Sequence, residues 1–245
     1  EVIYPLLNEE GIQKGAKNFS PEQLSSFYNI DVHEIENIND PEFVQTLAND
    51  PNLKGGVSVR CYQKFGEGII NMFENKGFLW NLHPGILPEY RGVMTLARAM
   101  ENEETQTSYS LHIIDKNWDA GSLLDIRPEP LNLHRPMLSN YCDLAPSGVP
   151  MIIENMSHFF AGTLPPELPQ DPQKAGYWTF PTPKELDTYK ENGLILVDHN
   201  EMAEIYMEAF KGSNEAFNQK LYSKITETIQ AWENNKTMDS PVKNK

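Results

Sequence analysis

The sequence predicts an α/β fold, with a doubly wound, mostly parallel sheet whose strands are joined by crossover helices. Segments typical of strands and of helices alternate along the first two thirds of the chain, which is the pattern of such a sheet. The chain has 245 residues, 39% of them hydrophobic, which is enough to bury one sizeable core, and no repeat period indicates a solenoid. We therefore expect one main domain with an appendage.

The amino-terminal elements follow from local patterns. Glu1–Tyr4 is typical of a short strand, and Ser20 forms a capping box with Gln23 that starts a helix running to about Tyr28. Ile30–Ile35 alternates apolar and polar residues, as a strand with one buried face does. The next expected elements are a helix over 41–48, a strand over 56–60 and a helix over 65–73.

A polar motif follows the next strand. The apolar run Phe78–Trp80 delivers Asn81 at its carboxyl end, which is where open α/β sheets bind ligands. A helix over 94–102 and a strand over 107–114 then lead into a polar loop over 115–121 and a further strand over 122–126. Two loops therefore approach from two strands, one offering Asn81 and His83 and the other offering Asp119.

Composition and charge narrow the function classes. The net charge of −15 argues against a nucleic-acid partner, because binding to a phosphate backbone relies on Lys and Arg side chains. Cys61 and Cys142 have the spacing of neither a disulfide framework nor a zinc site, so we expect a reducing cytoplasm and no metal. No apolar stretch reaches the ~18–20 residues that span a bilayer, so no membrane partner is expected.

Two segments carry motifs in a recognisable order and spacing. They are Asn81-Leu82-His83-Pro84, Leu87-Pro88 and Arg91-Gly92, followed by Ser110-Leu111-His112 and Asp119-Ala120-Gly121. They resemble the signature of the folate-dependent formyltransferases of one-carbon metabolism. That family formylates glycinamide ribonucleotide, initiator methionyl-tRNA and amino sugars on nucleotide carriers, and it includes a formyltetrahydrofolate hydrolase. The resemblance covers roughly Glu1 to Gly162 and implies a Rossmann-like fold with 10-formyltetrahydrofolate as the formyl donor.

Transfer of a formyl group to an amine needs residues of these types. The amine attacks the formyl carbon, and Asn81 can donate its side-chain N–H to the developing oxyanion, a contribution typically worth about 10²–10³ in rate. His83 lies two residues further along an extended chain, points to the same side and can donate when protonated. Asp119 is the carboxylate that would favour the protonated ring and help to remove the proton of the incoming ammonium. The resemblance implies the same three catalytic roles.

The resemblance also implies a set of binding residues. For folate they are Val59, Arg60, Cys61, Leu87, Asn117 and Trp118, and for the acceptor they are Pro84, Gly85, Ile86 and Arg91. By residue chemistry alone, Pro84 and Gly85 shape the loop. Arg91 is expected to hold that loop to a carboxylate or to touch an anionic substrate. His112 is expected to brace the catalytic loop.

The domain prediction is a catalytic domain over 1–162, followed over 163–245 by a Pro-rich linker and a helical extension. Glu1–Tyr4 then corresponds to the family's second strand, so the family's first βα unit is absent. We infer that the sequence is a fragment or that this unit is supplied otherwise. Thr182 and Glu185 form a capping box for the first helix of the extension. The aromatic run Tyr177–Phe180 is expected to pack near the folate entrance or to anchor the tail.

The sequence therefore predicts an enzyme, a formyltransferase that moves a formyl group from 10-formyltetrahydrofolate to the amine of a small-molecule acceptor. Two alternatives stay open. Water could replace the amine, which would make the protein a formyltetrahydrofolate hydrolase, or the chain could be a catalytically silent module that binds folate or another ligand. Exposed sheet edges would favour association into a homo-oligomer.

Overall fold

The computed structural model describes residues 3–234, which form two compact units. We call Ile35–Leu196 the sheet unit, because it contains the strands of the described chain. We call the two ends of the chain, up to Glu34 and from Val197, the helical unit. This division does not coincide with the predicted domain boundary at Gly162, since residues 163–196 belong to the sheet unit.

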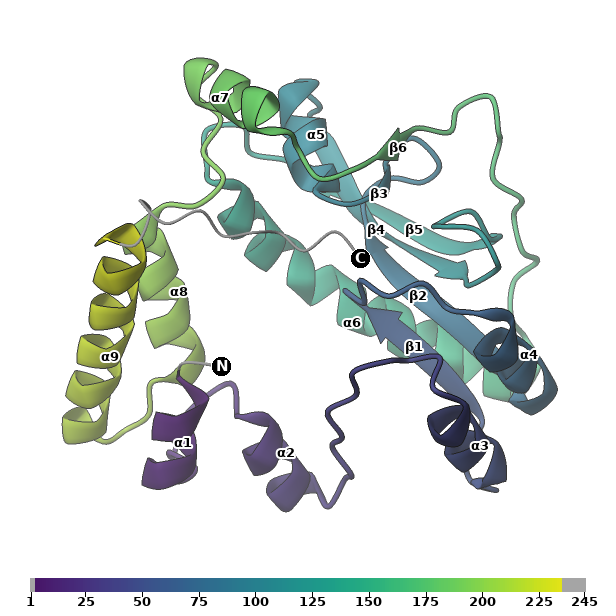
Figure 1. Ribbon diagram of the computed structural model, residues 1–245, viewed down its shortest axis with the longest axis horizontal. Helices are drawn as coiled ribbons and strands as arrows, with labels where there is room; N and C mark the ends of the chain where they lie inside the picture. The colour runs from purple at the N-terminus through teal and green to yellow at the C-terminus, as the bar shows by residue number, and fades with distance from the viewer. Residues whose placement is uncertain (1–2, 235–245) are drawn as a thin grey trace. The chain divides into compact units, whose positions relative to one another are not determined.

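The sheet unit is built on four strands (Figure 1). They are β1 (Gly55–Val59), β2 (Phe78–Pro84), β4 (Gln106–Ile113) and β5 (Leu123–Pro130), in the spatial order β1-β2-β4-β5. β1 and β2 are parallel, whereas β2–β4 and β4–β5 are antiparallel. A separate two-stranded sheet pairs β3 (Arg91–Gly92) in parallel with β6 (Tyr177–Trp178). The helices of this unit are α3 (Pro41–Asn49), α4 (Glu67–Lys76), α5 (Thr95–Glu101), α6 (Met137–Ala161) and α7 (Pro183–Glu191).

The predicted α/β class is confirmed, but the main sheet holds only one parallel pair among the described strands. For β4 and β5 the reason lies in the connection between them. A parallel crossover needs a dozen or more residues, and the loop over 114–122 between β4 and β5 is too short for one. β1 and β2 have room for the crossover helix α4 between them, and they pair in parallel as expected.

Helices cover both faces of the main sheet. Phe78, Trp80 and Leu82 share a buried cluster with residues of α6, whereas Leu79 packs against Ile69 of α4 on the other face. Because successive side chains of a strand point to opposite faces, β2 is apolar on both sides at its start, which explains the continuous run in the sequence. The same alternation places Asn81 and His83 on the face of Leu79.

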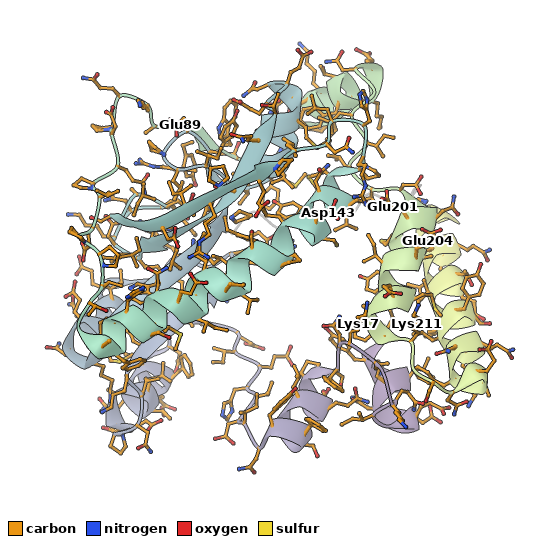
Figure 2. All side chains as sticks on the ribbon, turned by 180° about the vertical axis from the view of Figure 1, so that it is seen from behind. Lys17, Glu89, Asp143, Glu201, Glu204 and Lys211 are labelled. Carbon is orange, nitrogen blue, oxygen red and sulfur yellow. The ribbon has the colours of Figure 1, made fainter. Side chains whose placement is uncertain are left out.

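The helical unit consists of α1 (Tyr4–Glu10), α2 (Pro21–Tyr28), α8 (His199–Phe210) and α9 (Glu215–Asn234). Its buried apolar core joins both ends of the chain and includes Ile3, Leu7, Ala203, Phe210, Phe217, Leu221, Ile225 and Ile229. Lys17 and Lys211 both pair with Glu208 on the outside of this unit (Figure 2). The predicted carboxyl-terminal helices are therefore present, but α8 and α9 pack with the amino-terminal helices of the chain, whereas α7 belongs to the sheet unit.

Two predicted strands are wrong. Glu1–Tyr4 lies partly outside the described residues, and Tyr4 begins α1, where Pro5 occupies the first turn and suits a helix start. Ile30–Ile35 has no regular secondary structure and pairs with no described strand, and Ile30 and Val32 remain 49% and 46% exposed. An alternating pattern makes a strand only where a neighbouring strand completes its hydrogen bonds.

Predictions that rest on local capping are confirmed. Ser20 and Gln23 form the capping box of α2, which ends at Tyr28, and Thr182 and Glu185 form that of α7. The cap of α8 is Asp198, whose side chain accepts from the backbone N–H of Glu201. No helix within residues 3–234 combines the length and the apolar character that crossing a bilayer requires.

Candidate active site

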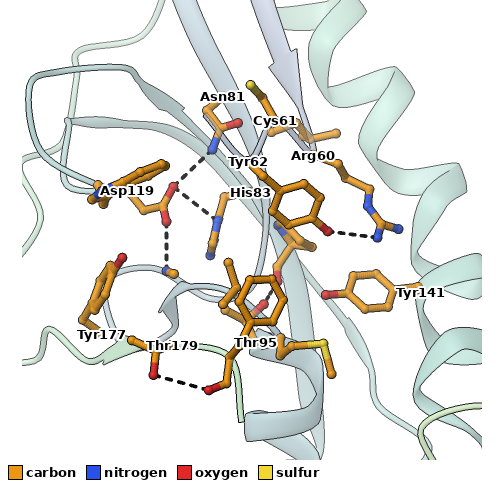
Figure 3. Close-up of a pocket in the computed structure, with 17 residues that line it drawn as sticks. Arg60, Cys61, Tyr62, Asn81, His83, Thr95, Asp119, Tyr141, Tyr177 and Thr179 are labelled. Atoms are coloured by element: carbon orange, nitrogen blue, oxygen red, sulfur yellow. Dashed lines mark hydrogen bonds and ion pairs between the residues drawn. The ribbon is translucent and has the colours of Figure 1, made fainter. Parts of the chain in front are cut away.

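The antiparallel pairing of β2 with β4 brings together the polar residues predicted for catalysis. Asn81 lies opposite His112 in the register, and the loop that follows β4 returns Asp119 to the same place (Figure 3). The Asn81 Nδ2 atom lies 3.1 Å from His112 Nε2 and donates to Asp119 Oδ1 at 3.3 Å. His83 Nδ1 lies 3.5 Å from the same Asp119 oxygen. The structure thus gathers Asn81, His83 and Asp119 into one cluster, with His112 beside them.

Asp119 is the centre of this cluster. Its Oδ1 atom faces Asn81, His83 and His112, the last at 3.6 Å, and its Oδ2 atom accepts a hydrogen bond of 2.9 Å from the backbone N–H of Gly92. Its backbone φ is +49°, in the left-handed region that non-glycine residues seldom occupy. Both carboxylate oxygens are therefore held by groups from β2, β4 and β3.

His112 orients Asn81. Its Nδ1 atom contacts the carbonyl oxygen of Ile113 at 2.7 Å, and because a carbonyl only accepts, Nδ1 carries the proton. In the neutral ring Nε2 is then an acceptor for the amide of Asn81. Both hydrogens of the Asn81 amide are thereby directed, one at His112 and the other at Asp119. This contact agrees with the expected bracing role of His112.

His83 is 3% exposed and contacts acceptors through both ring nitrogens. Its Nε2 atom lies 2.6 Å from the carbonyl oxygen of Tyr90 and so carries a proton, while Nδ1 faces the carboxylate of Asp119. A proton taken up on Nδ1 would therefore be held directly between His83 and Asp119.

Opposing effects set the charge states of this pair. Burial lowers the pKa of His83, and the negative charge of Asp119 opposes this shift without reversing it. Burial acts to raise the pKa of Asp119, but its contacts with His112 and His83 and the N–H of Gly92 lower that pKa below its usual value. The site therefore holds an ionised carboxylate against a buried imidazole that is readily neutral.

The cluster forms part of the wall of a cavity of about 270 Å³ (Figure 3). The predicted residues that line it are Arg60, Cys61, Asn81, His83, Pro84, Trp118 and Asp119. These residues come from the end of β1, from β2 and from the loop that follows β4. Three strand ends thus converge on one pocket.

Several predicted binding residues lie outside this pocket. Val59 ends β1 and is exposed, and Leu87 is 2% exposed within the core. Ile86 packs against the core, and Gly85 lies where an added Cβ would come 3.0 Å from the carbonyl oxygen of Tyr90. Asn117 lines a smaller neighbouring cavity. These positions shape the surroundings of the pocket more than its lining.

Arg91 also lies outside the pocket lining, where it holds a loop in place. Its guanidinium donates to Oε1 of Gln170 from Nε at 3.0 Å and from Nη2 at 2.8 Å. Arg91 therefore holds its loop to the amide of Gln170, where a carboxylate was expected.

Aromatic side chains form much of the pocket lining, and sequence reasoning missed Tyr141 among them. Tyr62, Tyr141, Tyr177 and Phe180 all line it, from segments far apart in the chain. The run Tyr177–Phe180 divides between the cavity and the protein core. Tyr177 and Phe180 face the cavity, whereas Trp178 stacks on the ring of Tyr90 with their centroids 6.4 Å apart. No pattern in the residues around Tyr141 indicates a pocket position, because Tyr141 lies within the helix α6.

The described part of the chain contains no group of three or more His, Cys, Asp or Glu side chains placed to hold a metal ion. A buried carboxylate, an imidazole and a carboxamide beside an aromatic cavity define a site for proton transfer and for stabilising a polar transition state.

Comparison with known proteins finds similarity to formyltransferases. Residues 10–128 match the family model described as formyl transferase. It is 27% identical over 155 residues to the methionyl-tRNA formyltransferase of Halothermothrix orenii, covering 63% of the chain and 48% of that protein. It is 36% identical over 87 residues to the GDP-perosamine N-formyltransferase of Brucella melitensis, covering 35% and 32%. The chain therefore spans half or less of each of these relatives.

Solved structures of formyltransferases share the fold. The formyltransferase PseJ of Anoxybacillus kamchatkensis, solved with a formamido sugar nucleotide and tetrahydrofolate, matches with a TM-score of 0.53 and 16% identity. That match covers 70% of the chain and 86% of PseJ. The N-formyltransferase of Helicobacter canadensis, solved with folinic acid and dTDP-3-aminofucose, matches with a TM-score of 0.52 and 20% identity over 66% and 55% of the two chains.

Proposed function

We propose that the protein transfers the formyl group of 10-formyltetrahydrofolate to the amine of a small-molecule acceptor. The observation that carries the proposal is the single carboxylate of Asp119 facing both Asn81 and His83 at the wall of the pocket. The match of residues 10–128 to the formyl transferase family model supports the reaction type. The catalytic part of the predicted domain 1–162 lies, in this proposal, within the sheet unit.

Asn81 stabilises the oxyanion in this mechanism. When the amine attacks the formyl carbon, negative charge develops on the former carbonyl oxygen, and an amide N–H can bind it without a change of protonation. The contact of Asn81 with Asp119, at 3.3 Å, is longer than its 3.1 Å contact with His112. We expect the oxyanion to replace the longer contact, while His112 keeps the amide oriented.

Asp119 and His83 accept the proton that the attacking amine loses. The nitrogen gains a positive charge as it bonds to carbon, and the ionised carboxylate of Asp119 can take its proton directly or through water. His83 Nδ1 lies against the same carboxylate and can receive that proton, because the Tyr90 carbonyl fixes the opposite edge of the ring. The proton then leaves toward the departing nitrogen of the folate.

The pocket lining fits the folate donor. A pterin is a flat aromatic ring and folates carry carboxylates, and the cavity offers aromatic rings together with the guanidinium of Arg60. Arg60, Cys61 and Trp118 would hold the cofactor in this proposal. When bound, the cofactor supplies the activated formyl group, and the protein supplies orientation, the oxyanion donor and the proton acceptor.

The acceptor is proposed to be a small molecule because the net charge of −15 disfavours a polyanion such as tRNA. We also propose a cytoplasmic location, on the ground that the spacing of Cys61 and Cys142 indicates no disulfide framework.

An assay of formyl release tests the proposal. The chain is incubated with 10-formyltetrahydrofolate, with and without a pool of sugar, amino-acid and nucleotide amines, and compared with Asn81→Ala and His83→Ala. We expect amine-dependent turnover that falls about 10²–10³-fold in Asn81→Ala. His134→Ala, which changes an exposed histidine of the same unit, serves as the control. Formate release without any amine would instead indicate the hydrolase, and folate binding without turnover would indicate a silent binding module.

A further inference from the structure

We propose that Gln170 is a positioning residue that fixes the backbone of the Asp119 loop relative to Gly92. Its side-chain Nε2 donates to the carbonyl oxygens of Asp119 at 2.9 Å and of Gly121 at 2.7 Å. Its Oε1 accepts both hydrogen bonds from Arg91. One amide thus bridges the two segments that form the site, and its catalytic meaning rests on the proposed function.

The two segments that Gln170 bridges are also joined by the hydrogen bond between Gly92 and Asp119. Arg91 directly precedes Gly92, whose N–H donates to Asp119 Oδ2 at 2.9 Å. Gln170 binds the backbone carbonyl of Asp119 itself. Gln170 therefore contacts the residue before the donor, Gly92, and the backbone of the residue that carries the acceptor, Asp119.

The Asp119 loop needs such support because its conformation is an unfavourable one. Asp119 has a φ of +49°, which costs free energy for a residue with a Cβ. Gly121 is confined as well, since an added Cβ would lie 2.0 Å from the carbonyl oxygen of Ile113. The hydrogen bonds of Gln170 act on these two residues, and they use both hydrogens of its amide.

The segment that carries Gln170 is anchored independently of this side chain. Leu168 exchanges two backbone hydrogen bonds with Leu123 of β5, at 2.8 and 3.0 Å. Further along, β6 pairs with β3 and Trp178 lies under the guanidinium of Arg98 at 5.2 Å. Loss of the Gln170 side chain should therefore release the Asp119 loop while the segment stays in place.

Two substitutions test the bridge from different sides. Gln170→Leu removes both halves of it, and Gln170→Glu keeps an acceptor for Arg91 but turns a carboxylate oxygen toward two carbonyls. Gln173→Leu, an exposed position in the same segment, is the matched control. We expect kcat to fall about 10–100-fold in both Gln170 variants. The KM for 10-formyltetrahydrofolate and the thermal midpoint should stay close to those of the control.

Hydrogen exchange at the Gly92 amide gives a readout that does not depend on activity. It should be faster in both Gln170 variants than in Gln173→Leu, because the carboxylate of Asp119 no longer stays in register with its donor. Unchanged exchange at Gly92, or wild-type kcat in Gln170→Glu, would overturn the proposal. If the unmodified chain releases no formyl group at all, the proposed function fails, and the exchange at Gly92 still decides whether Gln170 positions the loop.

Discussion

The two compact units bury polar side chains for different reasons. In the helical unit, the buried polar residues among those described are Ser20 and Gln23, which form the capping box of α2. In the sheet unit, His83 and His112 are buried beside Asp119 on the strands that form the pocket. Ser20 and Gln23 stabilise the start of a helix, whereas the cluster around Asp119 stabilises no helix end or turn.

This difference shows how buried polar groups can be interpreted. Removing a polar group from water is unfavourable unless hydrogen bonds replace those with water. A capping box compensates within its own helix, because each partner satisfies a backbone N–H. The Asn81–His112–Asp119 contacts join side chains of different segments and complete no helix cap, so local structure gives no reason for the set. A buried polar network without a local structural role therefore indicates a catalytic site better than a buried capping box does.

The largest expected effect separates activity from stability in the sheet unit. Asp119→Asn keeps an acceptor for Gly92 but cannot take a proton, so kcat for formyl transfer should fall about 10²–10⁴-fold. Thermal stability should fall only by what the loss of the Asp119 charge costs, because the side chain keeps its size. The test is steady-state kinetics beside a melting curve, and a variant with full activity would remove Asp119 from the mechanism.

The converse prediction concerns the helical unit. Leu221 is 0% exposed in the core that joins α1, α8 and α9. Leu221→Ala should lower the free energy of unfolding of this unit by about 2–5 kcal/mol through the cavity it leaves. Hydrogen exchange in α8 and α9 measures the loss, while turnover per folded molecule should stay the same. Tyr222→Ala, at an exposed neighbouring position, is the control.

A smaller effect is expected from pH, and the part that concerns the site comes from His83 and Asp119. The pKa of His83 lies below its usual 6.5, so the unfolded chain binds this proton first and stability falls as the pH drops below about 6.5. The pKa of Asp119 lies below 3.8, so a further loss begins as the pH falls past that value. Each tenfold difference in proton affinity between the two states amounts to about 1.4 kcal/mol.

Urea unfolding between pH 4.5 and 7.5 measures the first part of this dependence. His83→Gln should flatten the curve over that range, because glutamine does not titrate. His134→Gln should leave it as it is, since that side chain is exposed. Equal slopes in the two variants would show that His83 has the same pKa in the folded and unfolded chains.

The sequence carried enough information to place the centre of the site. Asn81 and His83 follow an apolar run, Asp119 follows the next long strand, and the alternation of side chains puts the first two on one face. These are short-range regularities, and the capping boxes at Ser20 and Thr182 belong to the same class. Each of them depends on a few adjacent residues, which is why the structure reproduces them.

The sequence did not predict features that depend on residues far away in the chain. Ile30–Ile35 has the period of a strand, but nothing in its own residues shows whether another strand will pair with it. Tyr141 reaches the pocket from a helix, and Gln170 reaches the Asp119 loop from a Pro-rich segment about 50 residues later. Neither follows a local period, because tertiary packing alone brings it to the site.

The smallest prediction compares the two capping boxes, which have the same pattern in different surroundings. Ser20 is 0% exposed, and Gln23 also donates to the carbonyl oxygen of Leu7 at 2.6 Å, so this box ties α2 to α1. Ser20→Ala should cost about 1–2 kcal/mol, the upper part of the range for caps. Thr182→Ala, in the exposed box of α7, should cost about 0.5–1 kcal/mol. Urea midpoints of the two variants give the comparison, and equal losses would mean that burial adds nothing to a cap.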